Sequence, residues 1–205
     1  MNYYAVGNIR GCYHTFLDLL ELMDFKSGQD ALVIPGNFIG PGAKLNKLVD
    51  LLMLMKTEGD AIPLIGAAEL CLLEPSKYEI DRDFVKNYES LLRPNYINWI
   101  LNLSNHYIYN GYYISNAGIN TYKLLKNQSN EDVTANLDKF LKEDLSYLGY
   151  KFIISSFFEG DEIVFLNNII NIETNCIGGS KLTAISLDGK ESEFAVSQNP
   201  KDRSL

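Results

Sequence analysis

The residues best placed to do chemistry lie in short, glycine-bearing loops that follow apolar runs. The first four loops are GNIRG (7–11), GNFIGPG (36–42), GAAE (66–69) and SNAG (115–118), and a longer fifth is NIETNCIGGSKLTAISL (171–187). Glycines in such loops let the backbone approach a ligand closely. Arg10 and Glu69 are the only charged side chains in the first four loops. The loops therefore have the form of a binding site but little of the chemistry that catalysis needs.

The elements that must position these loops alternate between strands and helices. Apolar runs at 3–6, 31–34 and 61–65 predict three buried strands, and helical spacing predicts helices over about 14–23 and 45–55. This alternation indicates βαβ units with a parallel core sheet. In open α/β sheets, ligands bind outside the carboxyl ends of the strands. We therefore expect the first three loops to meet at one edge of the sheet.

The rest of the chain is expected to complete the same domain. The predicted elements are a helical cap insertion at about 75–105, a hairpin over 107–115 about Asn110-Gly111, an acidic helix over 131–146, further strands in KFIIS, EIVFL and NIINIE, and a closing hairpin about Asp188-Gly189. The last residues have no apolar pattern and predict a loose tail. The sequence thus predicts a single domain over 1–196 and a flexible C-terminal tail over 197–205.

Composition limits the classes of function. The 205 residues carry a formal net charge of −8 with 46% hydrophobic residues, which argues against binding to nucleic acid or to an anionic membrane. The N-terminus has no signal-peptide pattern, and no apolar run is long enough to span a bilayer. Cys12, Cys71 and Cys176 are odd in number and widely spaced, as expected of a reducing compartment. We therefore expect a cytoplasmic protein.

In order and spacing, the five loops resemble the motifs of the calcineurin-like metallophosphoesterases. The closest likeness is to the bacterial branch that contains symmetrical diadenosine tetraphosphatases and serine/threonine protein phosphatases. That pattern runs Gly-Asp-x-His-Gly, Gly-Asp-x-x-Asp/Asn-Arg-Gly, Gly-Asn-His-Glu/Asp, His-Ala/Gly-Gly and Gly-His-Thr. The flanks YAVGNIRGCYHTFLDLLE and GGSKLTAISLDGKE agree too, so the resemblance covers roughly 3–196. It implies an α/β fold, a metallophosphoesterase-like mixed β-sandwich flanked by helices.

The chain departs from the family at the positions that carry its chemistry. Asn8 and Arg10 stand for the first Asp and His, Asn37 for the bridging Asp, Pro41 for the phosphate-binding Arg, Ala67 and Ala68 for the metal-binding Asn and catalytic His, Asn116 for the His of the fourth motif, and Ser156 for the last His. A dinuclear site needs anionic and imidazole ligands. The resemblance therefore predicts a pseudophosphatase with no metal, no cofactor and no catalytic residue.

Other residues have simpler interpretations than catalysis. Cys12 and His14 lie at an expected helix N-terminus, which can lower a thiol pKa, but Cys-Tyr after the first glycine is common in the family without a nucleophilic role. His106, beside Asn105, is interpreted as a surface hydrogen-bonding residue. The acids of 131–144 are interpreted as a solvated helix face.

Two roles remain open for Arg10. It is expected to pair with Glu69 and replace the metals structurally, or otherwise simply to be exposed at the surface; the alternative is that it binds a phosphate or nucleotide together with helix N-termini. We expect a protein-binding, scaffold or regulatory subunit whose partner is another protein. A phosphate- or nucleotide-binding sensor is the first alternative, and an active phosphoesterase with relocated ligands is the second.

Overall fold

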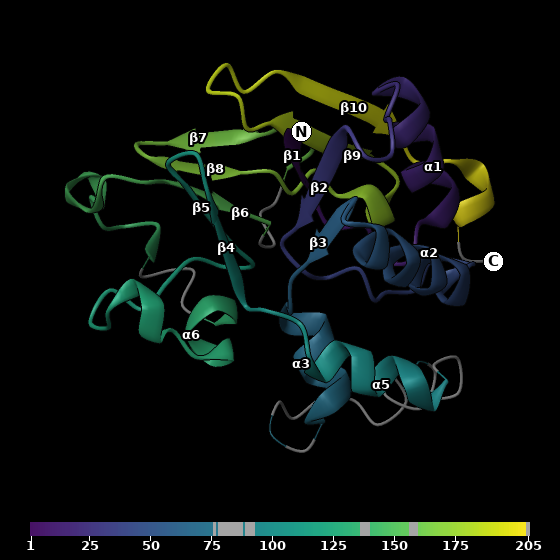
Figure 1. Ribbon diagram of the computed structural model, residues 1–205, viewed down its shortest axis with the longest axis horizontal. Helices are drawn as coiled ribbons and strands as arrows, with labels where there is room; N and C mark the ends of the chain where they lie inside the picture. The colour runs from purple at the N-terminus through teal and green to yellow at the C-terminus, as the bar shows by residue number, and fades with distance from the viewer. Residues whose placement is uncertain (76, 78–87, 89–92, 136–139, 156–159, 204–205) are drawn as a thin grey trace.

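Two five-stranded sheets pack face to face in the computed structural model, which describes residues 1–75, 77, 88, 93–135, 140–155 and 160–203 (Figure 1). The first sheet has the order β10-β9-β1-β2-β3 and the second the order β4-β5-β6-β8-β7. The strands of the first are β1 (Asn2–Val6), β2 (Asp30–Ile34), β3 (Ala61–Pro63), β9 (Lys181–Ser186) and β10 (Glu193–Ser197). Those of the second are β4 (His106–Tyr109), β5 (Tyr112–Ser115), β6 (Lys151–Ile154), β7 (Val164–Leu166) and β8 (Ile169–Asn171). The predicted mixed β-sandwich is confirmed.

Parallel strands form the centre of both sheets. β1, β2 and β3 run parallel, with Tyr4 opposite Leu32 and Val33 opposite Ile62. β5, β6 and β8 are also parallel, whereas β9 pairs with β1 in the antiparallel direction. The loops after β1, β2 and β3 therefore leave the same edge of the first sheet, as the alternation predicts.

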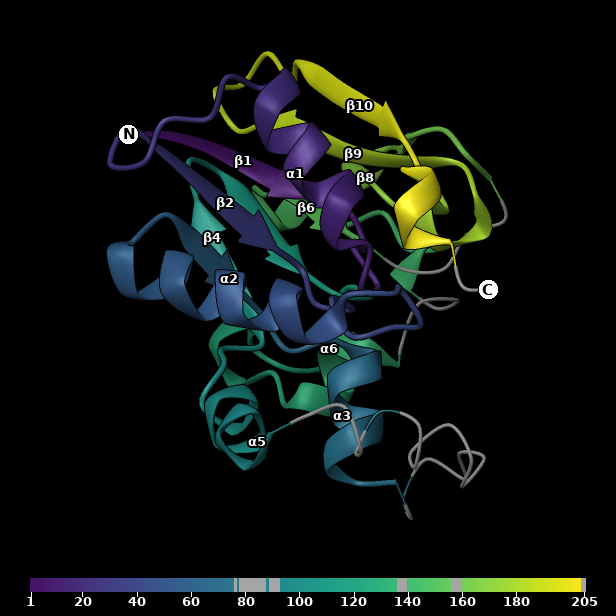
Figure 2. The same ribbon diagram turned by 90° about the vertical axis from the view of Figure 1, so that its right-hand side faces the viewer.

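Helices cover the outer face of the first sheet, where α1 (Tyr13–Leu22) and α2 (Leu45–Glu58) lie in front of its strands in Figure 2. Below the sheet, α3 (Ala67–Leu73) contacts α5 (Pro94–Leu101), which confirms a helix in part of the predicted insertion. Most of the rest of the predicted insertion, residues 76, 78–87 and 89–92, lies outside the described residues. No helix in the described ranges is long and apolar enough to cross a bilayer.

The core has three layers because the strand residues alternate between faces. In β2, Leu32 and Ile34 pack toward α1 and α2, whereas Val33 packs toward the second sheet. In β6, Ile153 faces the first sheet and Phe152 faces outward into the third cluster. Alternate strand residues thus pack the two sheets against each other. This packing fixes the position of the strand ends in one sheet relative to those in the other.

The predicted acidic helix over 131–146 is confirmed at its start, but its described part is not one continuous helix. α6 spans only Asn130–Thr134, and a 3-10 helix covers Ser146–Leu148. The reason is that Asp132 does not lie on a solvated face. Its carboxylate accepts the N–H and the hydroxyl of Ser129 in a capping box, which fixes the start of a short helix.

The predicted flexible tail over 197–205 is also wrong for its described residues. A 3-10 helix, Pro200–Asp202, packs against α1, and Asp202 is fully buried (Figure 2). Its carboxylate accepts the N–H of His14 at 3.1 Å and the N–H of Thr15 at 2.6 Å. Cys12, the N-cap residue of α1, makes no side-chain capping bond. Asp202 therefore satisfies helix donors that the local sequence leaves unpaired.

Candidate functional site

Backbone hydrogen bonds join the loops after β1 and β2. Arg10 donates its N–H to the carbonyl of Asn37 at 3.0 Å, and Gly42 donates to the carbonyl of Arg10 at 3.1 Å. The approach is so close that a Cβ atom at Gly42 would lie 2.1 Å from the carbonyl carbon of Gly11. Arg10 and Asn37 both have positive φ, at 46° and 53°, a conformation that Asn tolerates better than most residues. The expected convergence of these loops is confirmed.

Glu69 is the centre of this loop cluster. It is fully buried, and its carboxylate accepts the N–H groups of Asn37 at 2.8 Å, Gly66 at 2.9 Å and Ile39 at 3.0 Å. Burial raises the pKa of Glu69, and the three backbone donors oppose that shift. Its carboxylate therefore joins the loop after β2 to the start of α3.

The expected pair between Arg10 and Glu69 is not formed. Within the described ranges no ion pair joins the two side chains, because backbone N–H groups bind both carboxylate oxygens of Glu69. Burial raises the pKa of Glu173, and the charge of Arg10 acts on this carboxyl group in the opposite direction. Within the described ranges Arg10 therefore has no side-chain ion pair, either with Glu69 or with Glu173.

Three asparagines at the strand ends hold the loops together through their side-chain oxygens. The Oδ1 atom of Asn8 accepts the hydroxyl of Ser155 at 2.7 Å. Asn37 Oδ1 accepts the N–H of Ala68 at 2.9 Å, and Asn116 Oδ1 accepts the N–H of Ala67 at 3.1 Å. All three asparagines are at least 96% buried, with exposed fractions of 2–4%. Each amide oxygen thus already binds a protein donor.

Glu173, which sequence reasoning missed as a site residue, lies beside the same cluster. It is 4% exposed and follows β8 at the strand-end edge. Its Oε1 accepts the N–H of Asn175 at 2.8 Å. Burial raises its pKa, and the charge of Arg10 opposes the shift only in part. A carboxylate at the end of the predicted strand NIINIE, within the fifth loop, is the signal that could have identified it.

Buried polar atoms without partners surround Glu173. They include Glu173 Oε2, Asn8 Nδ2 and Asn171 Nδ2. Asn8 lies close enough to Glu173 to lower its pKa, but the two side chains form no hydrogen bond of ordinary geometry. Such atoms are rare in folded proteins and mark places where water or a ligand can bind.

The remaining predicted positions supply no titratable group to this cluster. Ala67 and Ala68 begin α3 and contribute only backbone N–H groups, and Pro41 lies exposed between two glycines. Cys12 is fully buried in the first core cluster. Ser156 lies outside the described residues. Within the described part of the chain, no group of three or more His, Cys, Asp and Glu side chains is arranged to hold a metal ion.

Comparison with known proteins gives the class to which this fold belongs. A solved structure titled a putative diadenosine tetraphosphatase matches with a TM-score of 0.77 and 18% identity over 97% of this chain and 94% of that one. A metallophosphoesterase from Sphaerobacter thermophilus matches with a TM-score of 0.56 and 11% identity over 97% and 89%. The chain therefore has the α/β fold of the calcineurin-like metallophosphoesterases.

Sequence similarity points to one branch of that fold. A symmetrical bis(5′-nucleosyl)-tetraphosphatase from Enterobacter sp. (strain 638) is 37% identical over 76 residues, which are 36% of this chain and 25% of that protein. The corresponding protein of Wigglesworthia glossinidia brevipalpis is 34% identical over 73 residues, 36% of this chain and 26% of that protein. The match thus spans about a quarter of these relatives. No protein-family model matches the chain.

Proposed function

We propose that this chain is a pseudophosphatase, a protein with a metallophosphoesterase fold that acts by binding rather than by hydrolysis. The observation that carries the proposal is the state of Asn8, Asn37 and Asn116. Of the two polar atoms in an asparagine amide, the oxygen can bind a hard cation and the nitrogen cannot. Each of these oxygens already accepts a hydrogen bond from Ser155, Ala68 or Ala67. They hold loops together in the place where metal ligands are expected.

The donor set at the strand ends does not fit a pair of divalent metals. Such a site needs several negative charges and imidazoles to offset two dications in a partly buried place. The cluster offers three neutral amides, the methyl groups of two alanines, and a fixed positive charge on Arg10. Glu69 and Glu173 add carboxyl groups, but both oxygens of Glu69 bind backbone N–H groups and Oε1 of Glu173 binds that of Asn175. Two carboxyl groups, with the charge of Arg10 beside one of them, fall short of the anionic and imidazole ligands that two dications need. We derive no hydrolytic step through a metal at this site.

The chain keeps the metallophosphoesterase fold but lacks a donor set for two metals. This combination supports a scaffold or regulatory role, with another protein as the partner. The loop network described above needs no metal for its cohesion, because side-chain amides and one carboxylate satisfy its backbone donors. The fold can therefore persist as a rigid binding module. The active-phosphoesterase alternative requires ligands outside these positions.

Metal analysis together with hydrolysis assays tests the proposal. Purified protein is analysed for bound metal and then assayed with p-nitrophenyl phosphate and diadenosine tetraphosphate in excess manganese, with a symmetrical tetraphosphatase as the positive control. We expect neither stoichiometric metal nor turnover. The matched variant is Asn37→Gly, because glycine accepts the positive φ of that position. Stoichiometric metal, or turnover that Asn37→Gly abolishes, would show that the chain is an enzyme.

A second candidate function, a phosphate or nucleotide sensor, is favoured by the polar atoms beside Arg10. The half-buried guanidinium of Arg10 and the unpartnered donors Asn8 Nδ2 and Asn171 Nδ2 are groups that bind anion oxygens. The buried carboxylate of Glu173 acts against such binding. Calorimetry with inorganic phosphate and with ATP tests this candidate, and heat that Arg10→Gln removes would support it. No heat at millimolar ligand would eliminate it.

A further inference from the structure

An open groove of about 790 Å³ lies outside the second sheet, on the face away from α1 and α2. We call it the Tyr122–Tyr147 groove. Its lining comes from edge strand β4, from the loop after Gly118 and from the segment before β6: His106, Ile108, Ile119, Thr121, Tyr122, Lys123, Leu124, Leu125, Lys126, Tyr147, Leu148 and Tyr150. It shares no lining residue with the strand-end cluster.

Large apolar side chains are concentrated on this groove and exposed to solvent. Tyr122 is 81% exposed, Tyr147 71%, Leu124 64% and Ile108 43%. These four are among the ten large hydrophobic side chains most exposed in the described ranges. Single exposed apolar residues are ordinary, but a contiguous group of them marks an interaction site.

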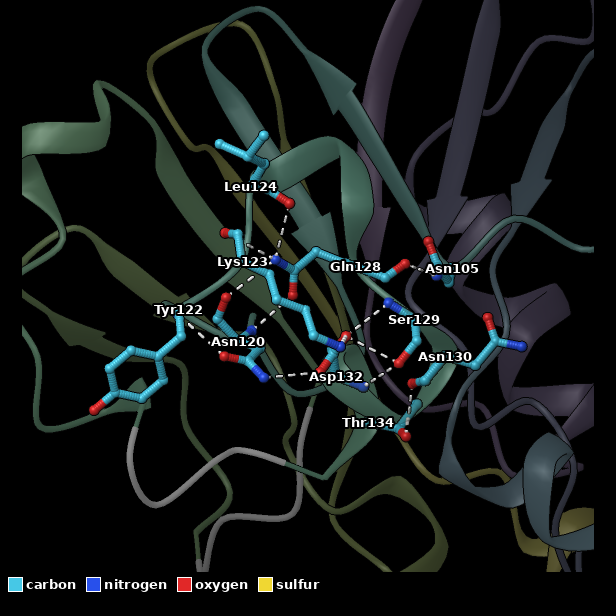
Figure 3. A network of polar contacts seen from close by, with 10 residues as sticks. All are labelled: Asn105, Asn120, Tyr122, Lys123, Leu124, Gln128, Ser129, Asn130, Asp132 and Thr134. Atoms are coloured by element: carbon cyan, nitrogen blue, oxygen red, sulfur yellow. Dashed lines mark hydrogen bonds and ion pairs between the residues drawn. The ribbon is translucent and has the colours of Figure 1, made fainter.

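A buried polar network holds the loop that presents two of these side chains (Figure 3). Gln128, 7% exposed, accepts the N–H of Asn120 at 2.7 Å. Its Nε2 donates to the carbonyls of Asn120 at 3.1 Å and Leu124 at 3.2 Å. One amide side chain thus ties both ends of the loop, while Tyr122 and Leu124 point away from it in Figure 3.

Asp132 anchors the same network from α6. It is 6% exposed and accepts from Asn120 Nδ2 at 2.9 Å and from the ammonium of Lys123 at 2.6 Å. The loop is therefore held in one conformation that exposes Leu124. Such preorganisation contributes nothing to core burial, but it lowers the entropy lost when a partner binds.

The charge of the groove is opposite to that of the whole chain. Its lining contains Lys123 and Lys126 but no carboxylate, although the chain has a net charge of −8. Asp132 neutralises Lys123, whereas Lys126 is exposed and has no ion pair within the described residues. Burial lowers the pKa of His106, so its imidazole is neutral at neutral pH. Lys126 therefore supplies the free charge of the groove.

We propose that the Tyr122–Tyr147 groove binds an extended segment of a partner protein that carries both carboxylates and large apolar side chains. The apolar side chains would contact Tyr122, Leu124 and Tyr147, and a carboxylate would contact Lys126. A drug-sized ligand is mostly enclosed by its pocket, and a groove with Tyr122, Leu124 and Tyr147 exposed at its rim by 64–81% does not provide that enclosure. The groove is separate from the strand-end cluster, so peptide binding there does not depend on whether the cluster holds a metal. This role is therefore additional to the proposed function.

Fluorescence anisotropy with defined peptides tests the groove. The probe is a short labelled peptide in which Asp and Glu alternate with Leu and Phe. Two comparison peptides carry Lys in place of the acids, or Ser in place of the apolar residues. We expect saturable binding of the first peptide only. Leu124→Asp and Lys126→Glu should each weaken it by about tenfold.

Matched variants separate the groove from general surface effects. Phe165→Asp changes a side chain of similar exposure (59%) on β7, outside the groove, and Lys190→Glu reverses an exposed charge on the β9–β10 turn. Both should bind the probe as the unmodified protein does. The proposal is overturned by absence of saturable binding, by equal binding of the Lys peptide, or by equal losses in Leu124→Asp and Phe165→Asp. Sedimentation velocity showing a dimer that Leu124→Asp dissociates would assign the groove to a second copy of the chain instead.

Discussion

Asp202 and Thr15 form a buried hydrogen-bonded pair although they are 187 positions apart in the chain. The carboxylate accepts the N–H of Thr15 at 2.6 Å and its hydroxyl at 2.8 Å. The same hydroxyl accepts the N–H of Asn199 at 2.9 Å. The residues after β10 therefore form the N-terminal cap of α1, the helix that follows the first strand-end loop.

Removing this cap should destabilise the whole domain. We expect Asp202→Ala to lower the free energy of unfolding by about 2–3 kcal/mol, because the N–H groups of His14 and Thr15 lose their acceptor and Thr15 is fully buried. Urea denaturation measures the change. The control is Asp161→Ala, an exposed acid far along the chain. Equal stability of the two variants would contradict the capping role.

Loss of the Glu69 carboxylate should have a larger effect. Glu69→Ala leaves the N–H groups of Asn37, Ile39 and Gly66 without their acceptor in a buried place. We expect a loss of about 3 kcal/mol or more, since each buried unsatisfied donor is costly. Chemical denaturation compares it with Glu21→Ala, an exposed acid on α1. A Glu69→Ala protein as stable as the Glu21→Ala control would refute this role of Glu69.

The raised pKa of Glu173 predicts a stability that falls with pH. Because burial raises this pKa above the value in the unfolded chain, the stabilising contribution of the protonated form is complete below the unfolded pKa. It is lost as pH rises through the folded pKa. Glu173→Gln removes the titration, so this variant should have a higher melting temperature than the unmodified protein at neutral pH. The difference should shrink when both are measured in acid, and a pH-independent difference would show that another property of the side chain causes it.

Asp132 should show the opposite dependence on pH. Burial alone would raise its pKa, but hydrogen bonds from Lys123, Ser129 and Asn120 outweigh burial and hold the pKa well below its ordinary value. The stability it contributes is present above the unfolded pKa and is lost as pH falls toward the folded pKa. Asp132→Asn should therefore lower the melting temperature at neutral pH, with a smaller difference in acid. Denaturation at several pH values checks this, with Asp161→Asn, a change at an exposed acid, as the control.

Local patterns predicted the strands and turns because their causes are local. Asn110 and Gly111 both have positive φ, as the hairpin turn between β4 and β5 requires. The buried runs before the first three loops became β1, β2 and β3 for the same reason. The ends of these strands then fixed where the candidate site lies.

The errors concern polar groups whose partners are distant in sequence. The local pattern around Asp202 predicts a solvated tail, because its partner Thr15 lies 187 positions earlier in the chain. Glu69 was assigned to Arg10 by proximity of strand ends, whereas backbone N–H groups of two loops compete more effectively for its oxygens. The acids near α6 looked like an exposed face because the capping box and the contacts of Asp132 depend on the folded loop.

The cap on α1 also has a consequence for the order of events during synthesis. The strand β1 needs β9 on one side, and the first turn of α1 needs Asp202. Both partners follow far later in the chain, so they leave the ribosome long after β1 and α1. The unit of β1, α1 and β2 must therefore wait with an unpaired strand edge and open helix donors, which expose it to aggregation and to chaperones during synthesis.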